Sequence, residues 1–292
     1  MKLTQRLGSV GRRSRAYFFL PNRWEEYDGL LRLLAEAGYV SLTLREFAER
    51  KNKKEALPDR RVFLRHDIDT DPGYVDYWLR SEKKFGFQAS YYFRLRTLDL
   101  KAMRRIESAG GEASYHFEEL ASVIRRRAIR SNLLAKNFIP EARDEFEKNY
   151  RRLQELCDWP LRTVAAHGDF VNRKVGMTSS VIISDPELRS KLGILAEAYD
   201  DHVTRAFASR FSDMMGGKGW RSQQLGTLDE IIAGGAPFQL LTHPRHWRAR
   251  IFANLREDVD RVLSAVANEL GVPAGGFVDY ANKRRQLTGR NL

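Results

Sequence analysis

The chain has 292 residues, a length that suits one large domain or two small ones. Hydrophobic residues make up 42% of it and charged residues 30%, a globular composition that excludes wholesale disorder. The net charge of +12 favours polyanionic partners such as nucleic acid, acidic sugars, nucleotide diphosphates or an anionic membrane face, without choosing among them. Solvated basic loops and helix faces would explain the same excess.

Cysteine content and the longest apolar runs indicate the compartment. Cys157 is the single cysteine, so an internal disulfide cannot form and a reducing compartment fits. No run approaches the roughly 18 apolar residues that indicate a membrane-spanning helix. The apolar stretch at 17–20 ends at Pro21 and is too short for the core of a secretory signal. We therefore expect a soluble, unexported, cytoplasmic protein.

The first elements along the chain are two helices and a strand. A helix is predicted after Asn22, which can cap it, and its end is predicted at Gly38. Thr43 and Glu46 form a capping-box pattern that opens a second, short helix. Residues 61–69 are an apolar run too short for a helix core, so they are predicted as a strand that enters a loop.

The same alternation of strand and helix continues to the end of the chain. Further strands are predicted at 89–93, 111–117, 163–167 and 239–243, and helices at 77–85, 100–108, 120–134, 140–157, 188–199 and 258–270. Such alternation favours a parallel sheet covered by helices, either a barrel or an open doubly wound sheet. No glycine-rich nucleotide-binding motif follows a strand, so the barrel is the better prediction. We expect a basic tail at 1–20, one domain at 21–285 and a short tail at 286–292.

Four of the six histidines follow or end a strand-like run. They are His66, His116, His167 and His243. Because the carboxyl ends of parallel strands meet at one edge, residues distant in sequence can meet there in one pocket. The alternative is that these histidines only hydrogen-bond neighbouring backbone.

Asp67 and Asp69 are the sharpest local feature. Their two-residue spacing at a strand end directs both carboxylates to the same side. Two close carboxylates repel unless a cation or a shared proton lies between them, which predicts a divalent metal on one and proton transfer on the other. His116 adds a nitrogen ligand, and a mixed set of Asp and His suits zinc or another first-row divalent ion. A turn-forming cluster that continues into 71–73 is the alternative.

The segments at 67–69, 110–118, 166–168 and 241–244 resemble, in order, the motifs of the polysaccharide deacetylase superfamily, known as carbohydrate esterase family 4. The stretches 24–47 and 210–213 resemble a divergent subgroup associated with bacterial capsule and O-antigen biosynthesis, so the resemblance covers about residues 20–255. It implies an α/β fold, a distorted (β/α)7-type, TIM-like barrel, and a metal-dependent carbohydrate N-deacetylase that hydrolyses an acetamido group.

The resemblance also implies roles for individual residues. Asp67 matches the catalytic base, Asp69 a metal ligand, His116 the first metal histidine and His243 the catalytic acid. Two departures affect this assignment. The second ligand histidine of the motif is replaced by Leu120, and the third motif lacks the arginine that orients the base. Either His167, Glu118 or Glu119 supplies the remaining ligand, and we assign it to His167, or the affinity for metal is poor. Zinc is the expected metal, with cobalt or nickel as alternatives.

Candidate substrate contacts lie beside these residues. They are Arg65, His66, Tyr115, Glu118, Arg245 and Trp247, and further candidate sugar platforms are Tyr91, Tyr92 and Trp220. Guanidinium groups pair with carboxylate or phosphate, which favours an anionic sugar such as a uronic acid or a diphosphate-linked glycan. Trp247 could instead pack into the barrel wall.

The predicted partner is an N-acetylated sugar on a nucleotide or a lipid, with peripheral contact at the inner membrane face and no specific nucleic acid. One alternative is a catalytically impaired barrel that binds carbohydrate, for which Leu120 is the evidence. The other is a nucleic-acid-binding protein, for which the positive net charge is the only evidence.

Overall fold

The computed structural model describes residues 21–213, 219–222, 226–252, 254, 255, 259 and 263. The tails predicted at 1–20 and 286–292 lie outside these residues, as does most of the helix predicted at 258–270. The predicted domain extent of 21–285 therefore stays a prediction. Within the described ranges, no helix combines the length and the apolar character that crossing a membrane requires.

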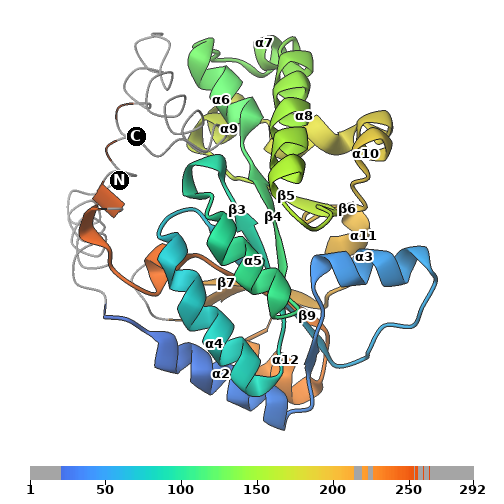
Figure 1. Cartoon of the computed structure of the whole chain (residues 1–292), viewed down its shortest axis with the longest axis vertical. Helices are drawn as coiled ribbons and strands as arrows, with labels where there is room; N and C mark the ends of the chain where they lie inside the picture. Colours follow the sequence, from blue (N-terminus) through green and yellow to red (C-terminus); the bar gives the residue numbers. More distant parts are fainter. Residues whose placement is uncertain are drawn as a thin grey trace.

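A sheet of nine strands forms the centre of the structure (Figure 1). Its strands follow the order β6-β5-β4-β3-β2-β9-β7-β8, and β1 pairs with the beginning of β2. Neighbouring strands are parallel except β7 and β8, which are antiparallel. The strands are β1 (Val40–Ser41), β2 (Arg61–Ile68), β3 (Ala89–Phe93), β4 (Glu112–Phe117), β5 (Thr163–Ala166), β6 (Ala196–Glu197), β7 (Ser209–Asp213), β8 (Trp220–Ser222) and β9 (Phe238–Thr242).

The sheet is open rather than closed. β6 and β8 lie at the two ends of the strand order, and no pairing joins them in the described part of the chain. The parallel α/β architecture predicted from the sequence is confirmed, and it is consistent with a distorted barrel that is open on one side. Closure into a (β/α)7-type, TIM-like barrel is not seen. The reason is that β6 has only two residues and β8 turns back antiparallel on β7, so neither edge continues the parallel ladder.

Helices follow most of the strands and pack on the sheet (Figure 1). They are α2 (Trp24–Glu36), α3 (Leu44–Asn52), α4 (Val75–Phe85), α5 (Leu100–Ser108), α6 (Glu119–Arg126), α7 (Asn132–Lys136), α8 (Ile139–Leu156), α9 (Phe170–Val175), α10 (Pro186–Leu192), α11 (Asp201–Thr204) and α12 (Leu228–Gly234). The capping box predicted for α3 is present in part, since Thr43 Oγ1 accepts a hydrogen bond from the Glu46 amide at 3.1 Å.

Two predicted helices differ from the structure. The stretch 120–134 is divided into α6 and α7, because the backbone at Ala128 adopts a φ of 50° between them. The helix predicted at 188–199 is wrong over its second half. α10 ends at Leu192, Gly193 adopts a φ of 66°, and β6 follows. Glycine takes this left-handed conformation without a steric penalty and therefore ends helices readily. The correction places a tight turn, rather than a helix, directly after β6.

A buried polar network fixes β2 against its neighbours. His66 projects into it from β2, with Nε2 2.7 Å from Glu82 and Nδ1 2.5 Å from the hydroxyl of Thr242 on β9. Glu82 on α4 also accepts hydrogen bonds from Tyr27 on α2, at 2.9 Å, and Tyr91 on β3, at 2.5 Å. Because buried polar groups are costly when unpaired, this network ties two helices and three strands to one arrangement.

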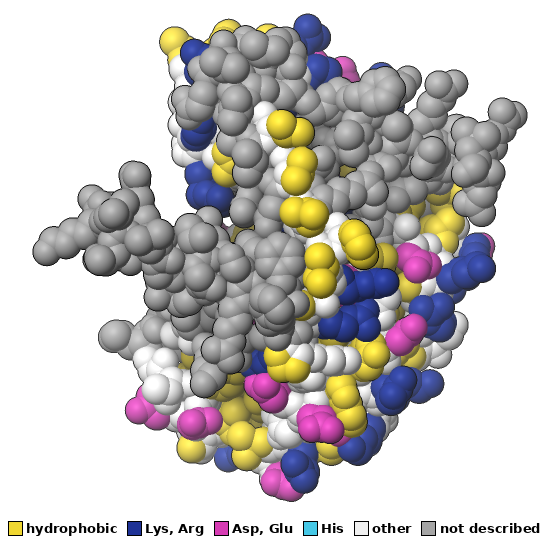
Figure 2. Space-filling model, turned by 90° about the vertical axis from the view of Figure 1, so that its left-hand side faces the viewer, with side chains coloured by type: hydrophobic (Ala, Val, Ile, Leu, Met, Phe, Trp, Pro, Cys, Tyr) yellow, Lys and Arg dark blue, Asp and Glu magenta, His cyan; other side chains and the backbone are white. Residues whose placement is uncertain are grey.

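Several basic residues of the described surface are paired with acidic ones. Arg126 and Arg127 both contact Glu141, at 2.6 and 3.1 Å, and Arg125 pairs with Asp169. Figure 2 shows Lys and Arg interspersed with Asp and Glu over the described part of the face it presents. The basic stretch at 125–130 is thus partly neutralised by local ion pairs.

Candidate active site

Five predicted catalytic and metal residues lie at the carboxyl ends of parallel strands. Asp67 and Asp69 are in or just after β2, His116 is in β4, His167 follows β5 and His243 follows β9. His116 Nε2 lies 3.4 Å from an oxygen of Asp67 and 3.4 Å from an oxygen of Asp69. His243 is close enough to lower the pKa of Asp67. Residues more than 170 positions apart in sequence thus meet at one edge of the sheet.

Asp69, His116 and His167 form a group whose ligand atoms all lie within 4.8 Å of one another. His167 Nε2 is 3.5 Å from Asp69 Oδ1, the same oxygen that faces His116. That oxygen is buried and has no hydrogen-bond partner in the described residues. His116 Nδ1 lies 2.9 Å from the carbonyl of Ala165, so Nδ1 carries the proton and Nε2 presents its lone pair. One carboxylate oxygen and two imidazole nitrogens fit a divalent first-row cation such as zinc.

His167 is suited to bind a cation because it is held neutral. Burial and the nearby Arg94 guanidinium lower the pKa of His167 to about 4. Its Nδ1 lies 3.6 Å from Glu118, and Arg94 binds the carboxylate of Glu118 through both Nε and Nη2. Glu118, predicted as a substrate contact, thus pairs with Arg94 and lies beside Nδ1 of His167. Leu120, which the resemblance aligns with a ligand histidine of the motif, is fully buried in the apolar core.

Arg65 and Asp67 form a buried bidentate ion pair. Arg65 Nε and Nη2 each donate a hydrogen bond of 2.8 Å, one to each oxygen of Asp67. Burial alone would raise the pKa of Asp67, but the charge of Arg65 and its hydrogen bonds to Asp67 outweigh burial and lower that pKa. Asp67 is thus ionised and held in one orientation. Arg65 is only 2% exposed and is committed to Asp67 and Tyr199, so the prediction that it binds substrate is not supported.

Asp213 at the end of β7 orients His243. One oxygen of Asp213 faces Nδ1 of His243 at 2.8 Å and Nδ1 of His246 at 2.9 Å. The other oxygen accepts from the His243 amide at 2.7 Å and from Trp247 Nε1 at 2.8 Å. Burial would lower the pKa of His243, but Asp213 outweighs burial and raises it to about 9. His243 is therefore protonated at neutral pH, as a general acid must be. Asp213 was not among the residues predicted from the sequence, although its position at the end of a strand-like stretch was an available signal.

Three other predicted substrate contacts point away from this group. His66 lies between Arg65 and Asp67, and because successive strand residues face opposite sides of a sheet, it enters the polar network under the helices. Tyr115 is buried and donates its hydroxyl to Glu119. Trp247 is 3% exposed and bonded to Asp213, so the alternative that it packs into the wall is correct.

The remaining candidates are mostly buried as well. Tyr91 and Tyr92 are fully buried aromatic residues of β3. Trp220 is half-buried and packs against Trp247 with ring centroids 6.1 Å apart. Arg245 is half-buried after β9, and its contact with substrate stays a prediction.

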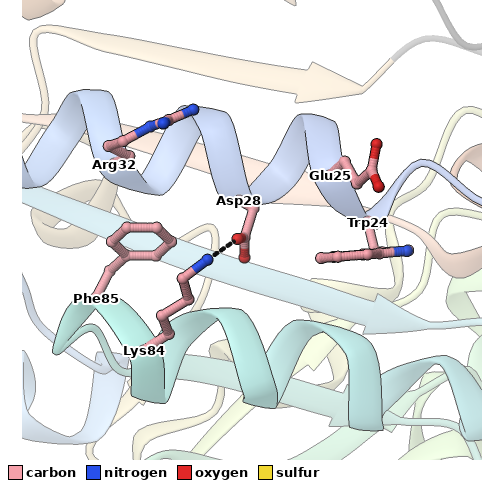
Figure 3. A pocket seen from close by; sticks show the side chains of 6 residues that line it. All are labelled: Trp24, Glu25, Asp28, Arg32, Lys84 and Phe85. Carbon is pink, nitrogen blue, oxygen red and sulfur yellow. Dashed lines mark hydrogen bonds and ion pairs between the residues drawn. The ribbon is translucent and has the colours of Figure 1, made fainter.

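A surface hollow between α2 and α4 shares no residue with this site (Figure 3). It has a volume of about 300 Å³. An ion pair between Asp28 and Lys84 crosses it, with Trp24 and Phe85 on either side. No histidine lines the hollow, and its two carboxylates, Glu25 and Asp28, are not among the candidate metal-binding groups of the described residues.

Comparison with known proteins gives distant structural likenesses. No protein-family model matches the chain, and no curated protein matches it. The deacetylase PplD of Streptococcus pyogenes, in complex with acetate, aligns with a TM-score of 0.42 and 13% identity over 78% of this chain and 84% of PplD. A mutant CE4 family pseudoenzyme aligns with a TM-score of 0.38 and 12% identity, over 74% of this chain and 65% of the pseudoenzyme chain. A mutant of the peptidoglycan deacetylase PdaC of Bacillus subtilis aligns with a TM-score of 0.33 and 14% identity, over 79% of this chain and 95% of the PdaC chain. Such low scores do not assign an activity, so the case for function rests on the site itself.

Proposed function

We propose that this protein is a metal-dependent hydrolase that removes the acetyl group from an N-acetylated sugar. The observation that carries the proposal is the grouping of Asp69, His116 and His167 beside an ionised carboxylate, Asp67, and a protonated imidazole, His243. Hydrolysis of an amide needs both an activated water and a proton donor for the leaving amine. The site supplies one candidate for each task, on separate strands.

Asp69, His116 and His167 would hold a divalent metal, which supplies polarisation of the acetyl carbonyl and of a water molecule when bound. Asp67 would accept the proton of the attacking water, and its fixed pairing with Arg65 keeps the accepting oxygen oriented. His243 would donate its proton to the departing sugar nitrogen, and Asp213 would stabilise the imidazolium until that transfer.

Finer aspects of the proposal rest on the resemblance alone. They are zinc as the metal, capsule or O-antigen biosynthesis as the setting, and a nucleotide-linked or lipid-linked substrate. An anionic sugar receives no added support from the arginines nearest the site. Arg65 and Arg94 are each neutralised by a buried carboxylate, and Arg248 pairs with Asp71 at 2.7 Å.

The proposal is tested by acetate release from a panel of N-acetylated sugar nucleotides, with added zinc, cobalt or nickel. We expect the wild type to release acetate and to bind about one metal ion per chain, which mass spectrometry under native conditions measures. Asp67→Asn should keep the metal and lose most of the activity. The control is Asp76→Asn, which removes a half-exposed carboxylate from an ion pair with Arg105 on the helical surface.

Two outcomes would contradict the proposal. Equal acetate release by the wild type and Asp67→Asn would exclude Asp67 as the base. A wild type that takes up none of the three metals and releases no acetate would favour the alternative function, a carbohydrate-binding protein without catalysis.

A further inference from the structure

Tyr199 is an exposed aromatic residue in the turn that follows β6. The residue is 40% exposed, whereas the aromatic residues predicted as sugar platforms are buried or half-buried. The guanidinium of Arg65 lies 4.6 Å from the ring centroid and covers one face of the ring. Among the described residues, no aromatic ring or second guanidinium stacks on the opposite face.

The turn that carries Tyr199 is held by hydrogen bonds and an ion pair. The Tyr199 amide donates to the carboxylate of Glu197 at 2.8 Å, and the other oxygen of Glu197 accepts from the Ala166 amide at 2.8 Å. The next residue, Asp200, forms a bidentate pair with Arg189 at 2.5 and 2.7 Å. The exposed ring is thus fixed through its backbone, through its hydroxyl and through one face, at a position where a free tyrosine would keep its rotamer freedom.

Tyr199 is also linked to the proposed base, Asp67, through a single bridging side chain, that of Arg65. Arg65 Nη2 donates to Asp67 at 2.8 Å and to the hydroxyl of Tyr199 at 3.2 Å, so a single nitrogen joins the two side chains. A sugar whose acetamido group reaches Asp67 and Asp69 must place its ring within a few ångströms of them. A scattered exposed aromatic residue needs no explanation, but an immobilised one beside the reacting groups does.

We propose that Tyr199 contacts the substrate, with its exposed ring face stacking on the pyranose ring of the N-acetylated sugar that is deacetylated. This inference rests on the proposed function. An aromatic ring offers a flat apolar surface with a negative face that suits the C–H face of a sugar. Since the ring is already ordered, binding costs little further side-chain entropy. Tyr199 would therefore contribute to affinity and to the choice of a pyranose ring, and not to the proton transfers.

The test compares Tyr199→Ala, Tyr199→Leu and Tyr199→Phe with the wild type. Loss of the ring in the Ala and Leu variants should raise KM about five- to tenfold, with kcat changed less than about twofold. The Phe variant keeps the ring and should keep KM near the wild-type value. Leu133→Ala, in an exposed apolar position on α7, is the control for a general loss of apolar surface. Thermal denaturation of each variant checks that it folds.

A binding measurement separates this inference from the proposed function. Calorimetric titration of the inactive Asp67→Asn protein with the same panel of sugar nucleotides should show weaker binding when Tyr199→Ala is added. Unchanged binding and unchanged KM, with acetate release intact in the wild type, would overturn the role of Tyr199 and leave the deacetylase proposal standing. A fall in kcat with unchanged KM would overturn it too, because Tyr199 would then act only through Arg65 on Asp67. Absence of both binding and acetate release across the panel would overturn both.

Discussion

The dependence of His243 on Asp213 gives a prediction that can be worked through in energies. Asp213 and, to a smaller extent, Asp69 and Asp67 raise the pKa of His243 from 6.5 to about 9, against the effect of burial. A difference of this size corresponds to about 3 kcal/mol in favour of the protonated imidazole. Asp213→Asn keeps the shape and an oxygen acceptor but removes the charge, so the pKa of His243 should fall to about 6.5 or lower.

The expected consequence is a loss of the proton donor under mildly alkaline conditions. At pH 8 about nine-tenths of the His243 side chains are protonated when the pKa is 9, and about 3% when it is 6.5. The activity of Asp213→Asn at pH 8 should therefore be about 30-fold below that of the wild type, with a smaller loss at pH 6. The measurement is the pH profile of kcat for acetate release at a fixed, saturating metal concentration.

Two further measurements do not depend on activity. The His243 imidazole, followed by nitrogen-15 NMR, should titrate near 9 in the wild type and near or below 6.5 in Asp213→Asn. Because the folded-state pKa is raised, its contribution to stability is complete below pH 6.5 and is lost as the pH rises through 9. The wild type should lose up to about 3 kcal/mol of unfolding free energy across this window, and the variant much less. A His243 that still titrates near 9 in Asp213→Asn would refute the reasoning.

Three further predictions concern the metal group, the base and the buried polar network. His167→Gln should weaken zinc binding at least about tenfold, because only Asp69 and His116 would remain as ligands of the group. Metal titration measures this affinity, and an unchanged value would remove His167 from the ligand set. Arg65→Lys loses the bidentate pairing with Asp67 and should lower kcat about 10- to 100-fold with little change in metal affinity; a wild-type kcat would show that orientation of Asp67 is unimportant. Glu82→Ala leaves three buried donors without their acceptor and should cost about 3–5 kcal/mol in urea unfolding. The exposed Arg127→Ala should cost under about 1 kcal/mol, and equal costs would contradict the importance assigned to burial.

Part of the site could be predicted because strand ends can be recognised from sequence. Asp67, Asp69, His116, His167 and His243 all stand at or beside the ends of strands that the apolar runs predicted, and parallel strands bring such ends together. Their assignment as ligands, base and acid remains a prediction for the experiments above. The structure adds that Leu120 faces the apolar core, so the group takes its third member from the loop after β5 rather than from α6.

Other parts depended on side-chain direction, which local patterns did not resolve. His66 and Arg65 both lie beside Asp67, yet the pleat of β2 sends one under the helices and pairs the other with the base. The apolar pattern around Tyr199 predicted a helix there. In the structure α10 ends at Leu192, before Gly193, so Tyr199 lies in an exposed turn instead. Asp213 became visible as the partner of His243 only once β7 was paired with β9.

The amino-acid sequence by itself determined the alternation of strands and helices, the parallel sheet and the strand-end residues, since periodicity and turn residues act over short stretches of chain. Only the tertiary structure decided which strands form the open edges of the sheet and which charges neutralise one another. It also decided which face each strand-end side chain takes, as with Arg65 against Asp67 and Asp213 against His243. These features depend on contacts between distant segments, whose energies come from burial and electrostatics in the assembled fold rather than from any local pattern.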